Sequence, residues 1–275
     1  MKFSVRLFGI SALLTGLSIS VPALAVDGVI EINQAKVAIG GITLSDNPGF
    51  PATIVTAGHY RLTSNLVINE TQRAIDIEVD NVTIDLNGFS IIGPVTCQAG
   101  ATTLCTTSIT PRAGVHTFTG THNVTILNGT ITGMESGVSC SSTEGCVVRN
   151  VNANNNSGYG IRVGTKGRVS NCSSQINGGA GISAGALAFV ENNIVSLNGR
   201  SGLSVLGEGV TAISNTFYSN VERAIDMNSH VTSIGGNTFN PKTAGLWFFD
   251  NSKMTEISPN VCIDGSPLYT NCTGL

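Results

Sequence analysis

The chain has 275 residues, a formal net charge of −3 at pH 7 and only 11% charged residues, against about 25% in typical domains. It therefore offers no basic footprint, which argues against nucleic acid as a partner and against an anionic membrane surface. Glycine occurs 33 times, and Asn, Thr, Ser, Val and Ile are abundant, a composition that favours strands and tight turns over helices.

The N-terminus, residues 1–25, has the pattern of a secretory signal peptide. Lys2 and Arg6 give a basic start, a mostly apolar run follows, and a small-x-small cleavage site ends at Ala25. The run is too short to cross a bilayer, and no later stretch approaches the length of a membrane-spanning helix. We therefore expect cleavage near Ala25, a secreted or periplasmic location, and no membrane insertion of the mature chain.

Residues 26–72 precede a regular repeat, and we expect them to form an N-terminal cap and a first coil. The segment 27–41 (DGVIEINQAKVAIGG) departs from the repeat. Because the ends of a stacked-strand fold expose unpaired edges and an apolar interior, both ends need covering. We assign this segment to that role as an amphipathic piece of chain.

A repeat of 21–22 residues fills the middle of the chain. Its opening positions are apolar and evenly spaced: Ile126, Val148, Val169, Val190, Ala212 and Ile234. A second interior column follows five residues later in each repeat. A third column, preceded each time by Gly or Ala, contains Val138, Ile161, Ile182, Leu203, Ile225 and Leu246.

Three short strands in a repeat of this length are typical of a parallel β-helix. Successive coils would stack about 4.8 Å apart, and each apolar column would become a stack inside the tube. Glycine before the third column permits a close approach that a Cβ would obstruct. The sequence predicts an all-β fold, a single right-handed parallel β-helix of about eight coils over residues 73–246, with caps at both ends.

One coil carries an insertion. The segment 80–93 (DNVTIDLNGFSIIG) fits the repeat, but its third strand comes only at Val115, after an inserted loop at about 93–112. Loops on a rigid scaffold are where binding residues concentrate. The loop leaves the tube just before His116, and we expect it to overhang that residue and its neighbours on the next coils.

The column three positions after each opener is partly polar. Asn193, Asn215 and Asn237 follow one another in it and predict an inward ladder in which each side-chain amide bonds the next coil. Cys172 occupies the same column, where a free thiol acts as a small hydrophobe. A catalytic role for this thiol is disfavoured because no histidine matches its register.

Six of the seven cysteines lie in local pairs. In an exported chain such spacing predicts disulfides, namely Cys97 with Cys105, Cys140 with Cys146, and Cys262 with Cys272. The last pair falls in residues 247–275, which we expect to form the C-terminal cap. No spacing resembles a zinc site, so we expect no bound metal, although Ca²⁺ stays open.

Three phrases resemble a known family: "DGVIEINQA", "NPGFPATIVTAGHYRLTSNL" and "DNVTIDLNGF". They look like exported bacterial right-handed parallel β-helix proteins of the pectin-lyase-like superfamily. The resemblance spans essentially the whole mature chain and implies the fold and export. The wider superfamily includes pectate lyases, polygalacturonases, alginate epimerases, phage tailspikes and adhesins, so by fold analogy alone it implies contact with carbohydrate.

The residue after each third-column position is expected to point outward. This outward column contains Asp76, His116, Ser139, Arg162, Ser183, Ser204, Asp226 and Trp247. His116 and Arg162 are the candidate catalytic residues, since a lyase or epimerase of acidic glycans needs a base and a cation that neutralises the uronate carboxylate. They would lie about 10 Å apart, two strand spacings. Ser139, Ser183 and Asp226 are candidate binding residues.

Three functions stay open at this point. The favoured one is an exported structural or interaction protein that contacts carbohydrate or cell-surface partners. The second is a small polysaccharide lyase or epimerase, which a pocket under the inserted loop would favour. The third is a self-associating, adhesin-like β-helix, which a large exposed apolar strip would favour. The sequence decides neither between them nor on the oligomeric state.

Overall fold

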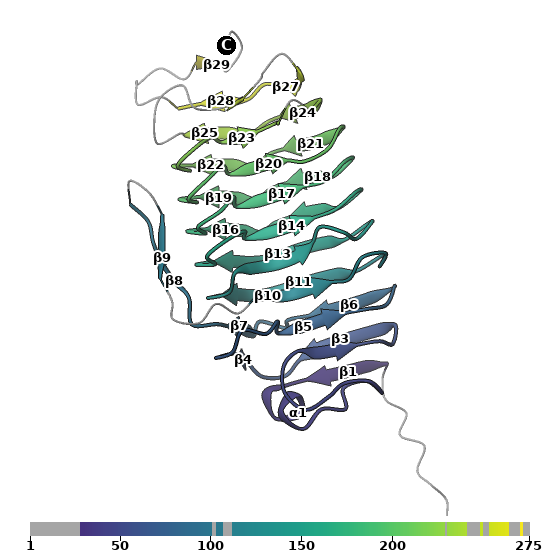
Figure 1. The fold of residues 1–275 in the computed structure, drawn as a ribbon. Helices are drawn as coiled ribbons and strands as arrows, with labels where there is room; N and C mark the ends of the chain where they lie inside the picture. The colour runs from purple at the N-terminus through teal and green to yellow at the C-terminus, as the bar shows by residue number, and fades with distance from the viewer. Residues whose placement is uncertain are drawn as a thin grey trace, which may run out of the picture.

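The chain folds into an upright tube of stacked coils, seen in the ribbon of a computed structural model (Figure 1). The structure describes residues 28–100, 103–106, 112–228, 230–240, 248–249, 253–263 and 270–271. The predicted signal peptide therefore lies outside the described residues. Among the described residues, no helix has the length and apolar character needed to cross a membrane.

One side of the tube is a nine-stranded parallel sheet, one strand from each coil. Its strands are β2 (Ala52–Ile54), β5 (Ile75–Ile77), β10 (Ala113–Thr117), β12 (Ser136–Cys140), β14 (Ile161–Val163), β17 (Ile182–Ala184), β20 (Leu203–Val205), β23 (Ile225–Asp226) and β26 (Phe248–Phe249). The predicted all-β parallel solenoid is thus confirmed, with one coil more than expected because β2 adds a strand before β5.

The rest of the wall is an eighteen-stranded sheet made of two rows of strands. The first row contains β1 (Val29–Ile32), β3 (Gly58–Leu62), β6 (Val82–Asp85), β11 (Thr125–Thr132), β13 (Val147–Asn154), β15 (Arg168–Ser170), β18 (Phe189–Glu191), β21 (Val210–Ile213), β24 (Thr232–Gly235) and β27 (Met254–Ser258). The second row contains β4 (Leu66–Val67), β7 (Ser90–Ile92), the ends of β11 and β13, β16 (Ser173–Gln175), β19 (Ile194–Ser196), β22 (Thr216–Tyr218), β25 (Thr238–Asn240), β28 (Val261–Cys262) and β29 (Thr270–Asn271).

The predicted repeat register is confirmed by the strand pairing. In the third column Ile161 pairs with Ile182, Ile182 with Leu203, and Leu203 with Ile225, and all four side chains are fully buried. The last step differs from the prediction: Ile225 pairs with Phe248, not with Leu246. The final coil is therefore two residues longer than predicted, and Leu246 itself lies outside the described residues.

The glycine before the third column is required by close packing. A Cβ built on Gly181 would lie 2.4 Å from Cγ1 of Val195 and 2.6 Å from Nδ2 of Asn198, both far closer than van der Waals contact. The glycine column thus lets the second-row side chains fill the interior right up to the turn, as the sequence predicted.

The predicted asparagine ladder is present and longer than expected. Nδ2 of Asn193 donates to Oδ1 of Asn215 at 2.9 Å, and Nδ2 of Asn215 donates to Oδ1 of Asn237 at 3.0 Å. The ladder continues to Asn260, and at its other end the backbone N–H of Cys172 donates to Asn193. Each amide therefore satisfies backbone groups at a turn that has no strand ladder of its own.

A second ladder, which the sequence analysis missed, runs along the next corner of the tube. Asn156, Asn177, Asn198 and Asn220 are buried and bond from coil to coil, with Nδ2-to-Oδ1 distances of 3.0, 3.0 and 2.9 Å. Their spacing in the sequence matches the repeat. In the sequence, this ladder can be recognised as an asparagine that recurs four residues before the Gly or Ala that precedes the third-column position.

Two of the predicted disulfides are present, Cys97–Cys105 and Cys140–Cys146. Cys262 is also disulfide-bonded, while its predicted partner Cys272 lies outside the described residues. Cys172 is a free, buried cysteine, in the interior position that its column predicted.

We expect Cys172 to resist thiol reagents in the folded protein. Burial raises the pKa of its thiol to about 11, and the side chain is only 3% exposed, so both the thiolate and access to it are scarce. A disulfide-exchange reagent at pH 8 should modify Cys172 only after urea unfolding, with the labelled peptide identified by mass spectrometry. Rapid labelling of native protein would contradict the interior position.

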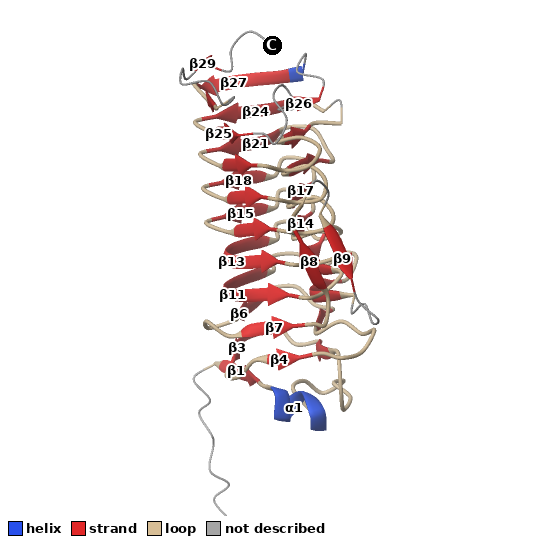
Figure 2. Ribbon diagram, turned by 90° about the vertical axis from the view of Figure 1, so that its left-hand side faces the viewer, coloured by secondary structure: helices blue, strands red, loops and turns tan. Residues whose placement is uncertain are grey.

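The N-terminal end of the tube is covered by the short helix α1 (Gln34–Ile39), visible at the foot of Figures 1 and 2. The side chain of Asn33 caps this helix by accepting from the Lys36 N–H, and Val37 packs into the core. Beside it, the Asp46 carboxylate accepts the backbone N–H groups of Ile42 and Thr53. These contacts satisfy backbone groups at the first strand of the nine-stranded sheet, where no earlier strand of that sheet pairs.

Candidate functional site

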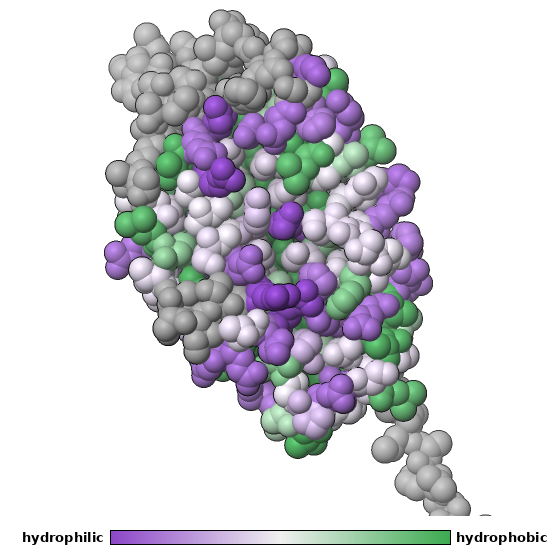
Figure 3. Space-filling model, viewed as in Figure 1, coloured by the Kyte–Doolittle hydropathy of each residue, from purple (hydrophilic) through white to green (hydrophobic). Residues whose placement is uncertain are grey.

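The predicted outward column is in register across the nine-stranded sheet. His116 pairs with Asp76 on one side and with Ser139 on the other, and Ser139 pairs with Arg162. The column continues through Ser183 and Ser204 to Asp226. Its next member is Phe249, not Trp247, which lies outside the described residues. Figure 3 looks onto this face, and its most hydrophilic group of side chains lies over β10, below the middle of the tube.

Three of the predicted site residues line one shallow cavity of about 410 Å³. We call it the arginine pocket, and its charged and hydrogen-bonding side chains belong to Arg73, Arg112, His116, Glu135, Ser139 and Arg162. The sequence analysis missed Arg73, Arg112 and Glu135. They lie two or three residues before the third-column positions Ile75, Val115 and Val138, at turns that are not part of the outward column. In the sequence they can be recognised as charged residues one or two positions before the strands β5, β10 and β12.

Asp76 lies beside the pocket and contacts two of its basic side chains. Its Oδ2 accepts from Arg73 at 3.2 Å, while its Oδ1 lies 3.4 Å from Nδ1 of His116. The second contact is within ion-pair range, yet neither Oδ1 nor Nδ1 has a hydrogen-bond partner among the described residues. We take it as an electrostatic contact, which becomes an ion pair when the imidazole carries a proton. Asp76 is only 5% exposed, so this contact is poorly screened by solvent.

The other two arginines are not neutralised by the described residues. The Arg162 guanidinium stacks on the ring of Tyr159, 4.5 Å from its centroid, and the buried Nε of Arg162 has no hydrogen-bond partner among the described residues. Arg112 is exposed, and its side chain makes no ion pair within the described part of the chain. A guanidinium with free donors in a partly desolvated site is suited to a planar oxyanion.

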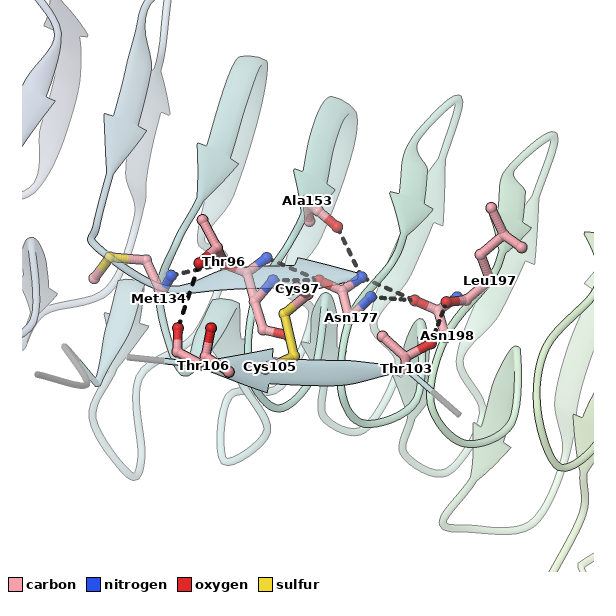
Figure 4. The surroundings of a disulfide bond; sticks show 11 residues. Thr96, Cys97, Thr103, Cys105, Thr106, Met134, Ala153, Asn177, Leu197 and Asn198 are labelled. Atoms are coloured by element: carbon pink, nitrogen blue, oxygen red, sulfur yellow. Dashed lines mark hydrogen bonds between the residues drawn. A yellow bond between two sulfur atoms is a disulfide. The ribbon is translucent and has the colours of Figure 1, made fainter. Parts of the chain in front are cut away.

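The inserted loop does not overhang this pocket as predicted. Its described part is the hairpin of β8 (Thr96–Gln98) and β9 (Leu104–Thr106), closed by the Cys97–Cys105 disulfide. Figure 4 shows it at the corner that carries the second asparagine ladder, where Thr103 Oγ1 donates to the Leu197 carbonyl at 2.8 Å. Only Arg112, of the described residues in the insertion, lines the pocket. The strands of the insertion pair with each other, which holds this segment in a hairpin.

Two predicted binding residues lie elsewhere. Ser183 was expected to be exposed but is 1% exposed, because its short side chain lies in the middle of the sheet between Arg162 and Ser204. Asp226 lines a second, smaller cavity farther along the same face. In the described residues, no group of three or more His, Cys, Asp or Glu is placed to hold a metal ion.

No curated protein matches the chain. Among solved structures, the Agl-KA catalytic domain is 16% identical with a TM-score of 0.41, covering 66% of this chain and 41% of that one. The enzymatically active domain of bacteriophage CBA120 tailspike protein 2 is 11% identical with a TM-score of 0.40, covering 78% of this chain and 39% of that one. This chain thus spans well under half the length of either structure.

A family match covers more than half of the chain, including His116, Ser139 and Arg162 of the arginine pocket. Residues 113–262 match the family described as "Right handed beta helix region". The match begins at β10 and ends at β28, which confirms the predicted right-handed coiling of these strands. Because it covers more than half of the 275 residues, the chain belongs to the right-handed β-helix family.

Proposed function

We propose that this chain is an exported carbohydrate-binding β-helix protein whose arginine pocket holds an acidic sugar unit of a glycan. The observation that carries the proposal is the charge of the pocket. Three guanidinium groups and one imidazole line it against the single carboxylate of Glu135, although the whole chain has a net charge of −3. A local cluster of cations in an acidic chain favours an anionic ligand.

The contacts within the pocket support a carboxylate in particular. Arg73 is held by Asp76, whereas Arg112 and Arg162 have no ion-pair partner among the described residues. A uronate carboxylate has the planar shape that accepts two parallel N–H bonds from one guanidinium. The Tyr159 ring fixes the Arg162 guanidinium in place, so less side-chain entropy is lost when the ligand binds.

Export is supported by the cysteines. Disulfides persist in oxidising compartments and are rare in the cytosol, and the described residues contain the Cys97–Cys105 and Cys140–Cys146 bonds. The signal-peptide pattern of residues 1–25 points the same way. A secreted or periplasmic location would place the polar face in contact with cell-surface or environmental glycans.

Arg162→Ala should weaken binding of an acidic glycan by at least about 1.5 kcal/mol, more than tenfold in Kd, because it removes a charge-assisted hydrogen bond. A glycan array would identify the ligand, and titration calorimetry would measure the affinity of each variant. Arg149→Ala is the matched control, since it removes an exposed arginine from β13 outside the pocket. Equal losses for the two variants, or no acidic glycan bound at all, would overturn the proposal.

A second candidate is a lyase or epimerase that uses the same pocket. The contact between His116 and the little-exposed Asp76 favours it, because a carboxylate beside an imidazole orients the ring and stabilises its protonated form after proton abstraction. Absorbance of unsaturated uronates in the presence of the bound glycan separates a lyase from a binding protein. In a lyase, His116→Ala would abolish turnover and leave binding largely intact.

A further inference from the structure

A second cavity lies on the same face of the tube, closer to the C-terminus. Its volume is about 240 Å³. We call it the hydroxyl pocket, and the residues that line it include Tyr159, Arg200, Ser201, Ser204, Glu222 and Asp226. Along the outward column, Ser204 is two strands and Asp226 three strands beyond Arg162. At about 4.8 Å per strand, the centres of the two pockets are on the order of 15 Å apart.

The feature of this pocket that points to a ligand is the side chain of Ser201. The residue is 2% exposed, and its Oγ has no hydrogen-bond partner among the described residues. A buried hydroxyl without a partner costs free energy in the folded protein, and such groups are uncommon in native structures. Ser201 is one of the residues that line the cavity, so a ligand hydroxyl bound there is the partner that we expect for this group.

The charges of the hydroxyl pocket differ in kind from those of the arginine pocket. Glu222 Oε1 lies 3.3 Å from Nε of Arg200, and Asp226 Oδ1 accepts the Asn228 N–H at 3.3 Å. Asp226 also lies 3.9 Å from Nη1 of Arg223, so both carboxylates of this lining have an arginine partner, and these two guanidinium groups are already paired, which disfavours a second uronate. Carboxylate acceptors beside an aromatic ring suit a neutral sugar, which donates from its hydroxyls and packs its apolar face on the ring.

The two pockets share a wall. Arg162 lines the arginine pocket, Tyr159 lines the hydroxyl pocket, and the guanidinium of the one stacks on the ring of the other. Between the pockets, Ser183 is buried on β17. A glycan that contacts both pockets would lie along the tube axis and cross β17.

We propose that the hydroxyl pocket is a second saccharide site, which takes a neutral sugar of the same glycan whose acidic sugar occupies the arginine pocket. The inference rests on the proposed function and narrows its ligand to an acidic heteroglycan, with uronic acid and neutral sugars in one chain. A polymer made only of uronic acids fills one pocket well and the other poorly.

The probes are three hexasaccharides: one from hyaluronan, which alternates uronic acid with a neutral sugar, one of galacturonic acid only, and cellohexaose, which has no carboxylate. Titration calorimetry on the full mature chain should rank the hyaluronan hexasaccharide first. Ser201→Ala should weaken its binding about tenfold, as for loss of one hydrogen bond in a desolvated site. The hyaluronan disaccharide, too short to span both pockets, should bind the variant and the wild type equally.

Stability supplies an independent readout for the same variant. Because the Ser201 hydroxyl has no partner in the free protein, Ser201→Ala should leave the melting temperature unchanged or raise it while affinity falls. Thr216→Ala is the control, which removes a hydroxyl and a methyl group at an exposed position on β22 outside both pockets. It should alter neither quantity.

The outcomes separate the two proposals. A hyaluronan hexasaccharide that binds wild type and Ser201→Ala equally, or no better than the galacturonate hexasaccharide, overturns the second site and leaves the arginine pocket standing. Loss of binding in Ser201→Ala but not in Arg162→Ala overturns the arginine pocket instead. Failure of all three hexasaccharides to bind the wild-type protein overturns both.

Discussion

Leu203→Asp is expected to abolish folding. Leu203 is fully buried and lies between Ile182 and Ile225 in the third interior column. An unpaired carboxylate at this place costs several kcal/mol, a large part of the about 5–15 kcal/mol by which native proteins are stable. Because each coil contacts only its neighbours, the variant would also uncouple the coils on either side. Far-UV circular dichroism and soluble yield would report the loss.

Two companion variants make the test specific. Leu203→Ala should fold and lose about 2–5 kcal/mol of unfolding free energy, the range for a cavity in a packed core. Thr216→Asp adds the same charge at an exposed position on β22 and should cost little. If Leu203→Asp and Thr216→Asp melted at similar temperatures, the interior column would be assigned to the wrong face.

The fold was predictable because the solenoid repeats one physical requirement in every coil. Ile161, Ile182 and Ile225 had to be apolar for the same reason, so six imperfect repeats together gave a register that no single strand would give. The register was wrong at the last coil, where Ile225 pairs with Phe248, and in the coil of residues 80–93, where we expected Leu86 as the opening position and Ile84 pairs with Ile126 instead. At the last coil the chain leaves the repeat, and periodicity carries no information on the length of a single turn.

The site was predictable in part, for a related reason. His116, Ser139 and Arg162 share the outward column, and the structure brings all three to one cavity. Arg73 and Arg112 reach the same cavity from turns, whose side-chain directions do not follow the strand period of two. A periodic argument therefore finds the residues on the sheet and misses those on its rim.

The packing between neighbouring side chains could not be predicted from the sequence either. Ser183 belongs to the outward column yet is buried, because exposure on a sheet depends on the size of the residues on both adjacent strands. The hairpin that contains Cys97 and Cys105 pairs with itself and lies against the corner near Leu197. Where a long loop rests is set by tertiary contacts that the loop sequence does not encode on its own.

The asparagine ladders yield the last prediction, that Asn215→Ala should destabilise the protein by at least about 3 kcal/mol. Its Oδ1 accepts from the backbone N–H and from Nδ2 of Asn193, and its own Nδ2 donates to the Val190 carbonyl and to Asn237. Alanine removes all four bonds, and each buried group that loses its partner costs about 1–3 kcal/mol before relaxation.

Asn152→Ala is the matched control, because Asn152 is exposed on β13 and its side chain is outside both ladders. Urea unfolding of the two variants, followed by circular dichroism, should give a midpoint far below wild type for Asn215→Ala and a nearly unchanged one for Asn152→Ala. A difference under about 1 kcal/mol, the value of a single net hydrogen bond, would mean that water replaces the missing amide. The ladder would then contribute little to the stability of the coils, and its role would be limited to favouring one register of the coils over others.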